Sequence, residues 1–508
     1  MIDKWLYPYV IAFTSFLLYF LGNAIKSRYS RTSLVLRYSS SAVMLLYSIV
    51  IISQPLDYVR GLLALLTSIV AIFITPYTVN YERHKYFGRN LTILIDLFVL
   101  SVYLVFISEN LISFVMFWLF AEIVGFFTIV FEVERRTLVA GLRYLLVSMV
   151  PADVALLSIL GITAMRLGFV EALQLPLNEL TTYLLGVNPV FHLIIAMGLL
   201  AKAAVAPFHF WLPDAHSLAP APASAILSGV MVKMGIYGFY LTVPAIESMY
   251  VYYVLLVFAS LSVVYGGLQA LIQADIKRIL AYSTIENTSL IAIALASYGA
   301  YKINLLLTAA LVYSVAHGIF KASLFMNSGT VEIITHTRDI SKLGYLAKVV
   351  SKPTITALLS ILSLIGTPPT LGFLGKVLLL AGLVSIYQIS MTTAILLLVV
   401  AALGAALAVA YGLRYVTVYW GSASRSEPKE LKLNTGTEAS ELSLSILNII
   451  LTLPLYVIIA ITGLISLDLL YVVPIGLATA MMTALIYYAY SLVKKSVKEE
   501  PWLGGVLP

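Results

Sequence analysis

LLAKAAVAPFHFWLPDAHSLAPAPASAILSGVMVKMGIYGFY, residues Leu199–Tyr240, is the stretch that decides the fold. One apolar segment carries Lys202 and is interrupted at Pro207, and a second apolar segment carries Lys233. A lysine in hydrocarbon is costly and by default marks a functional site. A broken helix at membrane depth is tolerated only where its freed backbone faces protein or water. The stretch therefore predicts a polar site inside a membrane. Snorkelling of Lys202 to an interface is the alternative, disfavoured because Lys202 lies within about one turn of the break.

The composition sets the class of protein. Hydrophobic residues make up 61% of the 508 residues and charged residues 11%, with a mean hydropathy of +0.98. Soluble domains carry about 25% charged residues. There are no cysteines, which excludes disulfides, cysteine-ligated iron–sulfur clusters and c-type haem in this chain. We therefore expect no bound cofactor and no metal site, and any redox chemistry would take place in a partner.

Apolar runs long enough to cross about 30 Å of hydrocarbon predict an all-α, polytopic membrane protein. The fifteen candidate segments are Trp5–Leu21, Leu34–Ile52, Leu62–Tyr77, Leu91–Ser108, Leu111–Phe131, Leu142–Met165, Val190–Ala206, Pro220–Val243, Tyr250–Gln273, Ile279–Ala296, Asn304–Met326, Thr354–Leu383, Met391–Trp420, Leu442–Ile465 and Leu467–Val493. The junction at Asp468 is short, so the count is fourteen or fifteen helices.

The distribution of basic residues predicts the orientation. When alternate loops are assigned to two sides, one side collects 22 lysines and arginines and the other only Lys4, Arg60, Arg166 and Lys302. Arg37 is counted among the 22 as a loop residue. Basic loops face the cytoplasm, so we expect a multi-pass protein of the cell membrane with its N-terminus outside and its C-terminus cytoplasmic. The net charge of +7 then reflects topology, not nucleic-acid binding.

A second interrupted segment indicates an internal repeat. Gly366, Pro368, Pro369 and Gly372 break the twelfth segment, and Lys376 follows. Broken helices in corresponding positions of two halves point to an inverted repeat with its site near the midplane. We expect three N-terminal helices in residues 1–90, a first five-helix unit in 91–245 and a second in 246–420, with C-terminal helices and a cytoplasmic tail in 421–508. An odd number of helices per unit makes successive units enter from opposite sides.

Charged residues inside the apolar segments are the candidate site. The basic ones are Lys202, Lys233, Lys321, Lys376 and Arg414, of which Arg414 is expected to snorkel; the acidic ones are Glu122, Asp96 and Asp153. His317 precedes Lys321 by four residues, which puts both on one helix face. His209 and His216 fit a helix-break cap and a proton relay equally well.

Four motifs resemble one family. The run AKAAVAPFHFWLPDAHSLAPAPASAILSGVMVKMGIYG, together with Gln273–Ser289, Ala316–Val331 and Gly366–Lys376, is similar to the antiporter-like, proton-translocating subunits of respiratory complex I, membrane-bound hydrogenases and Mrp-type cation/proton antiporters. The resemblance covers about the third to the thirteenth helix. It implies fourteen core helices and no bound redox centre.

The resemblance also implies roles for particular residues. Glu122 matches the essential glutamate of helix five, and Lys202 matches the helix-seven lysine that pairs with it. Lys233 matches the connecting lysine of helix eight. His317 and Lys321 match the histidine and lysine of helix eleven, and Lys376 matches the terminal charged residue of helix twelve.

Physical chemistry gives this set a mechanism. Desolvation disfavours a charged lysine and a nearby carboxylate favours it, so the distance between the two can switch proton binding. Histidine suits a relay because its ordinary pKa is near neutral.

Two functions fit. The preferred one is a proton-pumping, non-redox membrane subunit of a complex I-type oxidoreductase complex, driven by electron transfer in partner subunits such as those of NADH–quinone, ferredoxin or hydrogenase complexes. The alternative is a subunit of a multi-subunit Mrp-type Na⁺/H⁺ antiporter. Lys376, together with the lack of a long lateral helix, favours a pump module in the middle of a membrane arm. Partners would be other membrane subunits, protons, lipid and, in the alternative, Na⁺.

Overall fold

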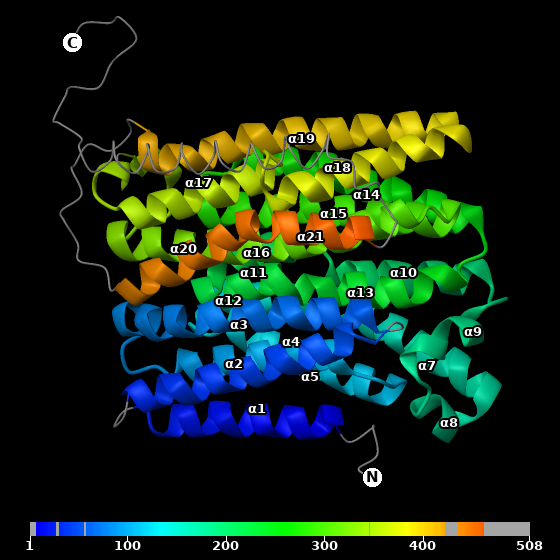
Figure 1. Ribbon diagram of the computed structural model, residues 1–508, viewed down its shortest axis with the longest axis horizontal. Helices are drawn as coiled ribbons and strands as arrows, with labels where there is room; N and C mark the ends of the chain where they lie inside the picture. The colour runs from blue at the N-terminus through cyan, green and yellow to red at the C-terminus, as the bar shows by residue number, and fades with distance from the viewer. Residues whose placement is uncertain (1–6, 27–29, 55–56, 345, 422–434, 462–508) are drawn as a thin grey trace, which may run out of the picture.

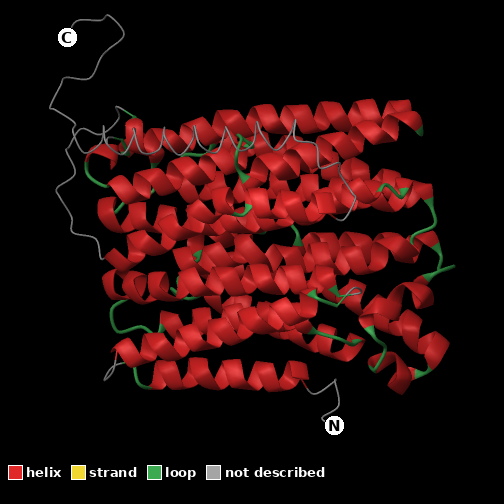
Figure 2. Ribbon diagram, viewed as in Figure 1, coloured by secondary structure: helices red, strands yellow, loops and turns green. Residues whose placement is uncertain are grey.

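The computed structural model describes residues 7–26, 30–54, 57–344, 346–421 and 435–461. Within these ranges the regular structure is helical throughout, with no strand (Figure 2). Eleven of the described helices are long and apolar enough to cross a membrane, and three shorter apolar helices accompany them. The predicted all-α, multi-pass membrane fold is confirmed.

The helices follow the predicted segments in order and lie roughly side by side in one stack (Figure 1). The first five are α1 (Tyr7–Ala24), α2 (Ser30–Ile52), α3 (Tyr58–Lys85), α4 (Leu91–Ile107) and α5 (Leu111–Ile129). The sixth segment joins α6 (Arg135–Tyr144) to α7 (Val150–Leu167) through the π-helical turn η2 (Leu145–Met149), and the short helices α8 (Phe169–Leu173) and α9 (Leu180–Leu184) follow. The eighth joins α12 (Ala221–Ile226) to α13 (Val232–Thr242) through the π-helical turn η4 (Leu227–Met231).

The second half continues with α14 (Met249–Ile272), α15 (Ile276–Tyr301) and α16 (Asn304–Thr335), and later with α19 (Met391–Trp420), α20 (Thr435–Ile450) and α21 (Thr452–Ile461). The central helix α16 packs against α3, α12, α15, α20 and α18 (Leu371–Ser385). The fifteenth predicted segment, Leu467–Val493, lies outside the described residues.

Both predicted helix breaks are present. Helix seven consists of α10 (Pro189–Lys202) and α11 (Leu212–Leu218), and helix twelve of α17 (Ser351–Ile365) and α18 (Leu371–Ser385). In Figure 1 the chain passes from α10 on the right to α11 on the left, but from α17 on the left to α18 on the right. The two broken helices therefore cross the stack in opposite directions, as an inverted repeat requires.

Two isolated β-bridges support the same relation. Asn110, just before α5, pairs with Pro176, and Asp275, just before α15, pairs with Asp339. Each bridge joins the start of the second helix of a unit to the loop between its third and fourth segments. The hydrogen bonds also correspond, with Leu111 donating to Leu175 and Ile276 donating to Arg338. The units are thus alike in chain path as well as in helix number.

The structure corrects the assignment of Arg37 to a loop. Arg37 lies inside α2, fully buried, with Nη2 at 2.7 Å from Asp96 Oδ1 on α4. A second bond joins Nε to Oδ2 at 2.7 Å, and Asn23 also donates to Asp96. The buried Arg37 guanidinium is tolerated inside the helix because it forms a direct, two-bond ion pair with the Asp96 carboxylate. This ion pair binds α2, one of the N-terminal helices, to α4, the first helix of the first five-helix unit.

Candidate functional site

Glu122 and Lys202 form a buried ion pair. Glu122 lies in α5, Lys202 is the last residue of α10, and neither side chain is exposed. Lys202 Nζ lies 2.7 Å from Glu122 Oε1 and donates to the Tyr144 hydroxyl at 3.0 Å and to Ser148 Oγ at 3.4 Å. The ammonium also lies 4.6 Å from the centroid of the Tyr144 ring. The pairing implied by the resemblance is therefore present in the structure.

The π-helical turns supply partners for two lysines. Ser148, which faces Lys202, belongs to η2, and the carbonyl of Ser228, in η4, accepts from Lys233 Nζ at 2.8 Å. π-Bulges are often found at functional sites. Both turns thus lie where the helix has to present a polar group to a buried cation.

The second contact joins Lys233 to His317. Lys233 Nζ on α13 lies 2.5 Å from His317 Nδ1 on α16, and both residues are fully buried. Nζ and Nδ1 can share a proton only if one of them lacks it, because two fully protonated groups have no acceptor between them. The contact therefore requires that at least one of the two nitrogens is without its extra proton.

Lys321 and Lys376 are held by backbone carbonyls. Lys321 Nζ donates to Leu280 O at 2.8 Å and to the hydroxyl of Ser283. Lys376 Nζ, from α18, reaches back to the last carbonyls of α17 and donates to Leu364 O at 2.8 Å and Ile365 O at 3.1 Å. Among the described residues no hydrogen bond joins Lys202 to Lys233 or Lys321 to Lys376, so the predicted set forms separate clusters.

Sequence reasoning missed Glu286 at this site and left the role of His216 open. Glu286 is fully buried in α15 and its carboxyl group accepts from the Tyr411 hydroxyl. His216, in α11, is fully buried and stacks on Phe325 with a centroid distance of 4.7 Å. Glu286 could have been found, because it is an ionisable residue within the predicted segment Ile279–Ala296. The surroundings of His216 could not, since the break hides which half-helix enters the core.

The remaining polar candidates, Asp153 and His209, lie in different surroundings. Asp153, on α7, is partly buried and is the second carboxyl group whose charge acts on the Glu122–Lys202 pair. His209 packs against Tyr265 with a centroid distance of 4.7 Å. No group of three or more potential metal ligands occurs within the described part of the chain.

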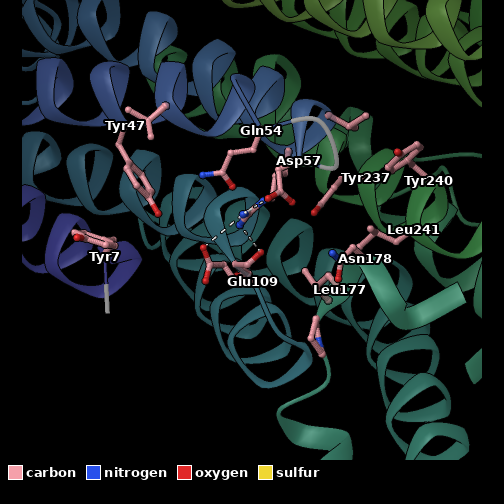
Figure 3. A pocket seen from close by; sticks show the side chains of 15 residues that line it. Tyr7, Tyr47, Gln54, Asp57, Glu109, Leu177, Asn178, Tyr237, Tyr240 and Leu241 are labelled. Carbon is pink, nitrogen blue, oxygen red and sulfur yellow. Dashed lines mark hydrogen bonds and ion pairs between the residues drawn. The ribbon is translucent and has the colours of Figure 1, made fainter. Parts of the chain in front are cut away.

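A cavity lies beside each of the two β-bridges. The larger, about 800 Å³, is lined by Asp57, Arg60, Glu109, Pro176 and Tyr237, among others, as Figure 3 shows for the labelled side chains. The smaller, about 380 Å³, is lined by Asp275, Glu332, Arg338 and Asp339, among others. Because the bridges are equivalent in the inverted units, the cavities lie at opposite ends of the helix stack.

Charged groups gather in the larger cavity. Arg60 lies 2.8 Å from Asp57 Oδ2 and 3.5 Å from Glu109 Oε1. Burial raises the pKa of Glu109, and the charge and hydrogen bond of Arg60 oppose this shift. Tyr237, which lines the same cavity, is one helical turn from Lys233 on α13. The larger cavity therefore reaches to within about one helical turn of Lys233 along α13.

The comparison with protein families settles the relationship. The family described as NADH:quinone oxidoreductase/Mrp antiporter, TM, matches residues 108–403, more than half of the chain. The chain belongs to this family. All the predicted site residues from Glu122 to Lys376 lie within the matched region.

Individual relatives agree with the family. Hydrogenase-4 component B of Escherichia coli is 29% identical over 338 residues, 63% of this chain and 49% of the relative. NADH-quinone oxidoreductase subunit M of Rickettsia prowazekii is 35% identical over 236 residues, 46% of each chain. The chain thus matches about half the length of these relatives. A chain of the Mrp complex from Dietzia has the same fold, with a TM-score of 0.74 at 18% identity over 96% of this chain and 99% of that one.

Proposed function

We propose that this antiporter-family chain is a proton-translocating membrane subunit of a redox-driven complex of the complex I type. The observation that carries the proposal is the fully buried Glu122–Lys202 pair, with Nζ and Oε1 2.7 Å apart, next to a second buried Lys233–His317 contact. Buried charges are expensive and are kept where they serve a pathway. We propose Glu122, Lys202, Lys233, His317, Lys321 and Lys376 as the residues that carry protons.

In the proposed mechanism the ion pair is the switch. While Glu122 stays close, Lys202 keeps its proton, because the carboxylate offsets the desolvation of the ammonium. When the carboxylate moves away or is neutralised, Lys202 releases the proton toward Lys233. His317 then takes the proton from Lys233, and Lys321 and Lys376 carry it through the second unit.

Access from both sides of the membrane would come through the two cavities. The cavity at Asp275 and Glu332 lies at the face that we propose is cytoplasmic, and the cavity at Asp57 and Glu109 at the external face. The orientation follows the bias of basic residues, with the N-terminus outside and the C-terminus cytoplasmic in the cell membrane. The units at 91–245 and 246–420 are proposed as the two half-pathways.

The proposed partners are other membrane subunits, because the relatives are named as parts of larger assemblies: a hydrogenase component and a subunit of a quinone oxidoreductase. The alternative is a subunit of a Na⁺/H⁺ antiporter without redox partners. This alternative is supported by the likeness in fold to a chain of an Mrp complex, which extends over nearly the whole length of both chains.

Transport by inverted membrane vesicles separates the two functions. Vesicles from cells with and without this chain are loaded with a pH-sensitive dye, then given either a reductant (NADH, reduced ferredoxin or hydrogen) or Na⁺. Acidification that needs the reductant and this chain supports the redox-driven pump. Proton efflux triggered by Na⁺ in energised vesicles supports the antiporter. If the vesicles show neither of these two responses, both functions are overturned.

A further inference from the structure

Glu286 is a buried carboxyl group in the second unit, on a helix that packs against the helices of Lys321 and Lys376. Its side chain is fully buried in α15, and the carboxyl oxygen Oε1 has no hydrogen-bond partner among the described residues. The other oxygen accepts from the Tyr411 hydroxyl of α19. An unpaired carboxylate oxygen in the core is costly, which calls for a compensating cation or a proton.

Two lysines supply the surrounding positive charge. Lys376 and Lys321 are the two cations whose charges act on Glu286. Neither forms a direct ion pair with it within the described part of the chain, although α15 packs against both α16, which carries Lys321, and α18, which carries Lys376. A carboxyl group that feels the charges of both lysines can exchange a proton with each of them.

The packing leaves room for this carboxyl group. A Cβ atom on Gly404 of α19 would lie 3.4 Å from Glu286 Oε1 and only 2.8 Å from Val263 Cγ1. A Cβ atom on Gly266 of α14 would lie 2.8 Å from the Glu286 backbone nitrogen. Glycines on both neighbouring helices therefore admit the Glu286 segment of α15.

The position of Glu286 in the second unit corresponds to that of Glu122 in the first unit. Glu122 lies eleven residues after Leu111, the first residue of α5, and Glu286 lies ten residues after Ile276, the first residue of α15. Both acids are thus in the second helix of their unit, at nearly the same number of residues from the start of that helix. In the first unit the acid faces Lys202, at the break of helix seven; in the second it lies near Lys376, at the break of helix twelve.

We propose that Glu286 is the proton-carrying carboxylate of the second unit, passing a proton from Lys321 to Lys376. This inference rests on the proposed function. In the forward step protonated Lys321 gives its proton to the Glu286 carboxylate, leaving a neutral amine and a neutral acid. The acid then gives that proton to neutral Lys376, which becomes the ammonium, and Glu286 is again a carboxylate. One proton moves and no charge is created.

The test is proton uptake by inverted vesicles carrying the whole native complex, driven by whichever of reductant or Na⁺ drives wild type. Glu286→Gln keeps the shape and removes the exchangeable proton, so transport per assembled complex should fall about a hundredfold, the lower end for a positioned proton-transfer group. Glu286→Asp should recover part of it, which a merely structural role would not predict. Should Glu286→Gln not assemble, Tyr411→Phe removes only the hydroxyl donor to the same group and should lower transport by a smaller factor.

The matched control is Glu441→Gln on α20. Glu441 is also a buried carboxyl group with a hydroxyl donor, Thr330 Oγ1 at 2.8 Å, but no lysine charge acts on it. This variant should transport like wild type. If wild type transports and Glu286→Gln or Tyr411→Phe matches it, the inference about Glu286 is wrong and the proposed function stands. If wild type responds to neither driver, the proposed function fails and this inference falls with it.

Discussion

Replacement of Glu122 by glutamine tests the switch directly. The amide has nearly the shape of the carboxyl group but no charge, so Lys202 loses the partner that lies 2.7 Å from its Nζ. Both side chains are fully buried, so the ammonium has no bulk solvent beside it to replace that partner. The change therefore isolates the electrostatic part of the contact.

The structure sets the size of the effect. Removing one partner of a buried ion pair costs about 3–5 kcal/mol. Tyr144, through its hydroxyl and ring, and Ser148 still face the ammonium, so we take the lower end. About 3 kcal/mol corresponds to about two powers of ten in the population of protonated Lys202. Transport per assembled complex should fall by about that factor.

The measurement is driven proton uptake in inverted vesicles, normalised to assembled complex so that folding losses are not mistaken for transport losses. Lys202→Met should fall as strongly, and Glu122→Asp should retain part of the activity because it keeps the charge on a shorter stem. Asp96→Asn is the control, because it breaks another buried ion pair, with Arg37, away from the lysines. It should lower the amount of complex but not transport per complex. Wild-type transport in Glu122→Gln together with inactive Asp96→Asn would refute the reasoning.

Three further predictions follow from the fold and the cavities. A reporter fused after Arg425 should be cytoplasmic and one fused after Lys302 external, and the opposite result at both sites would reverse the orientation. Since burial raises the pKa of Glu109, an infrared carboxyl band that disappears in Glu109→Gln should titrate above the ordinary range of a glutamate; titration within or below that range would contradict this. Protonation of Glu109 then favours the folded state, and this contribution to stability is lost as pH rises through its folded-state pKa. Gly372→Ala should lower the thermal stability of the complex, because the new Cβ would lie 1.7 Å from Ser363 O; unchanged stability would mean that the helix-twelve break can relax.

Much of the fold could be predicted because hydrocarbon imposes strong rules on sequence. Runs of about 20 apolar residues define spans, and prolines and glycines mark the breaks at Pro207 and Gly366. Both breaks are found between helices, at Ala203–Trp211 and Gly366–Thr370. The six site residues taken from the family motifs all proved to be buried, but only two pairs of them are joined by an ion pair or a hydrogen bond.

The errors have a common physical cause. Arg37 was taken as a loop residue because it lies near other basic residues in the sequence, yet its partner Asp96 is 59 residues away. Glu286 was passed over because the groups that act on it, the Tyr411 hydroxyl and the charge of Lys376, come from later helices. Local sequence shows the cost of a buried charge but not the partner that offsets it, because that partner is set by tertiary packing.

The two units also show why residue spacing alone hides the repeat. Lys202 is the last residue of α10, whereas Lys376 belongs to the second half of its broken helix, eleven residues beyond Ile365. Both ammonium groups nevertheless lie at the end of a first half-helix, because Lys376 folds back onto the carbonyls of Leu364 and Ile365 at the end of α17. The C-terminal end of a helix carries partial negative charge and stabilises a cation there. Each unit thus places an ammonium at the end of its first half-helix and a carboxyl group nearby on its second helix. An inverted pair of such sites would give protons one switch for each half of the membrane path.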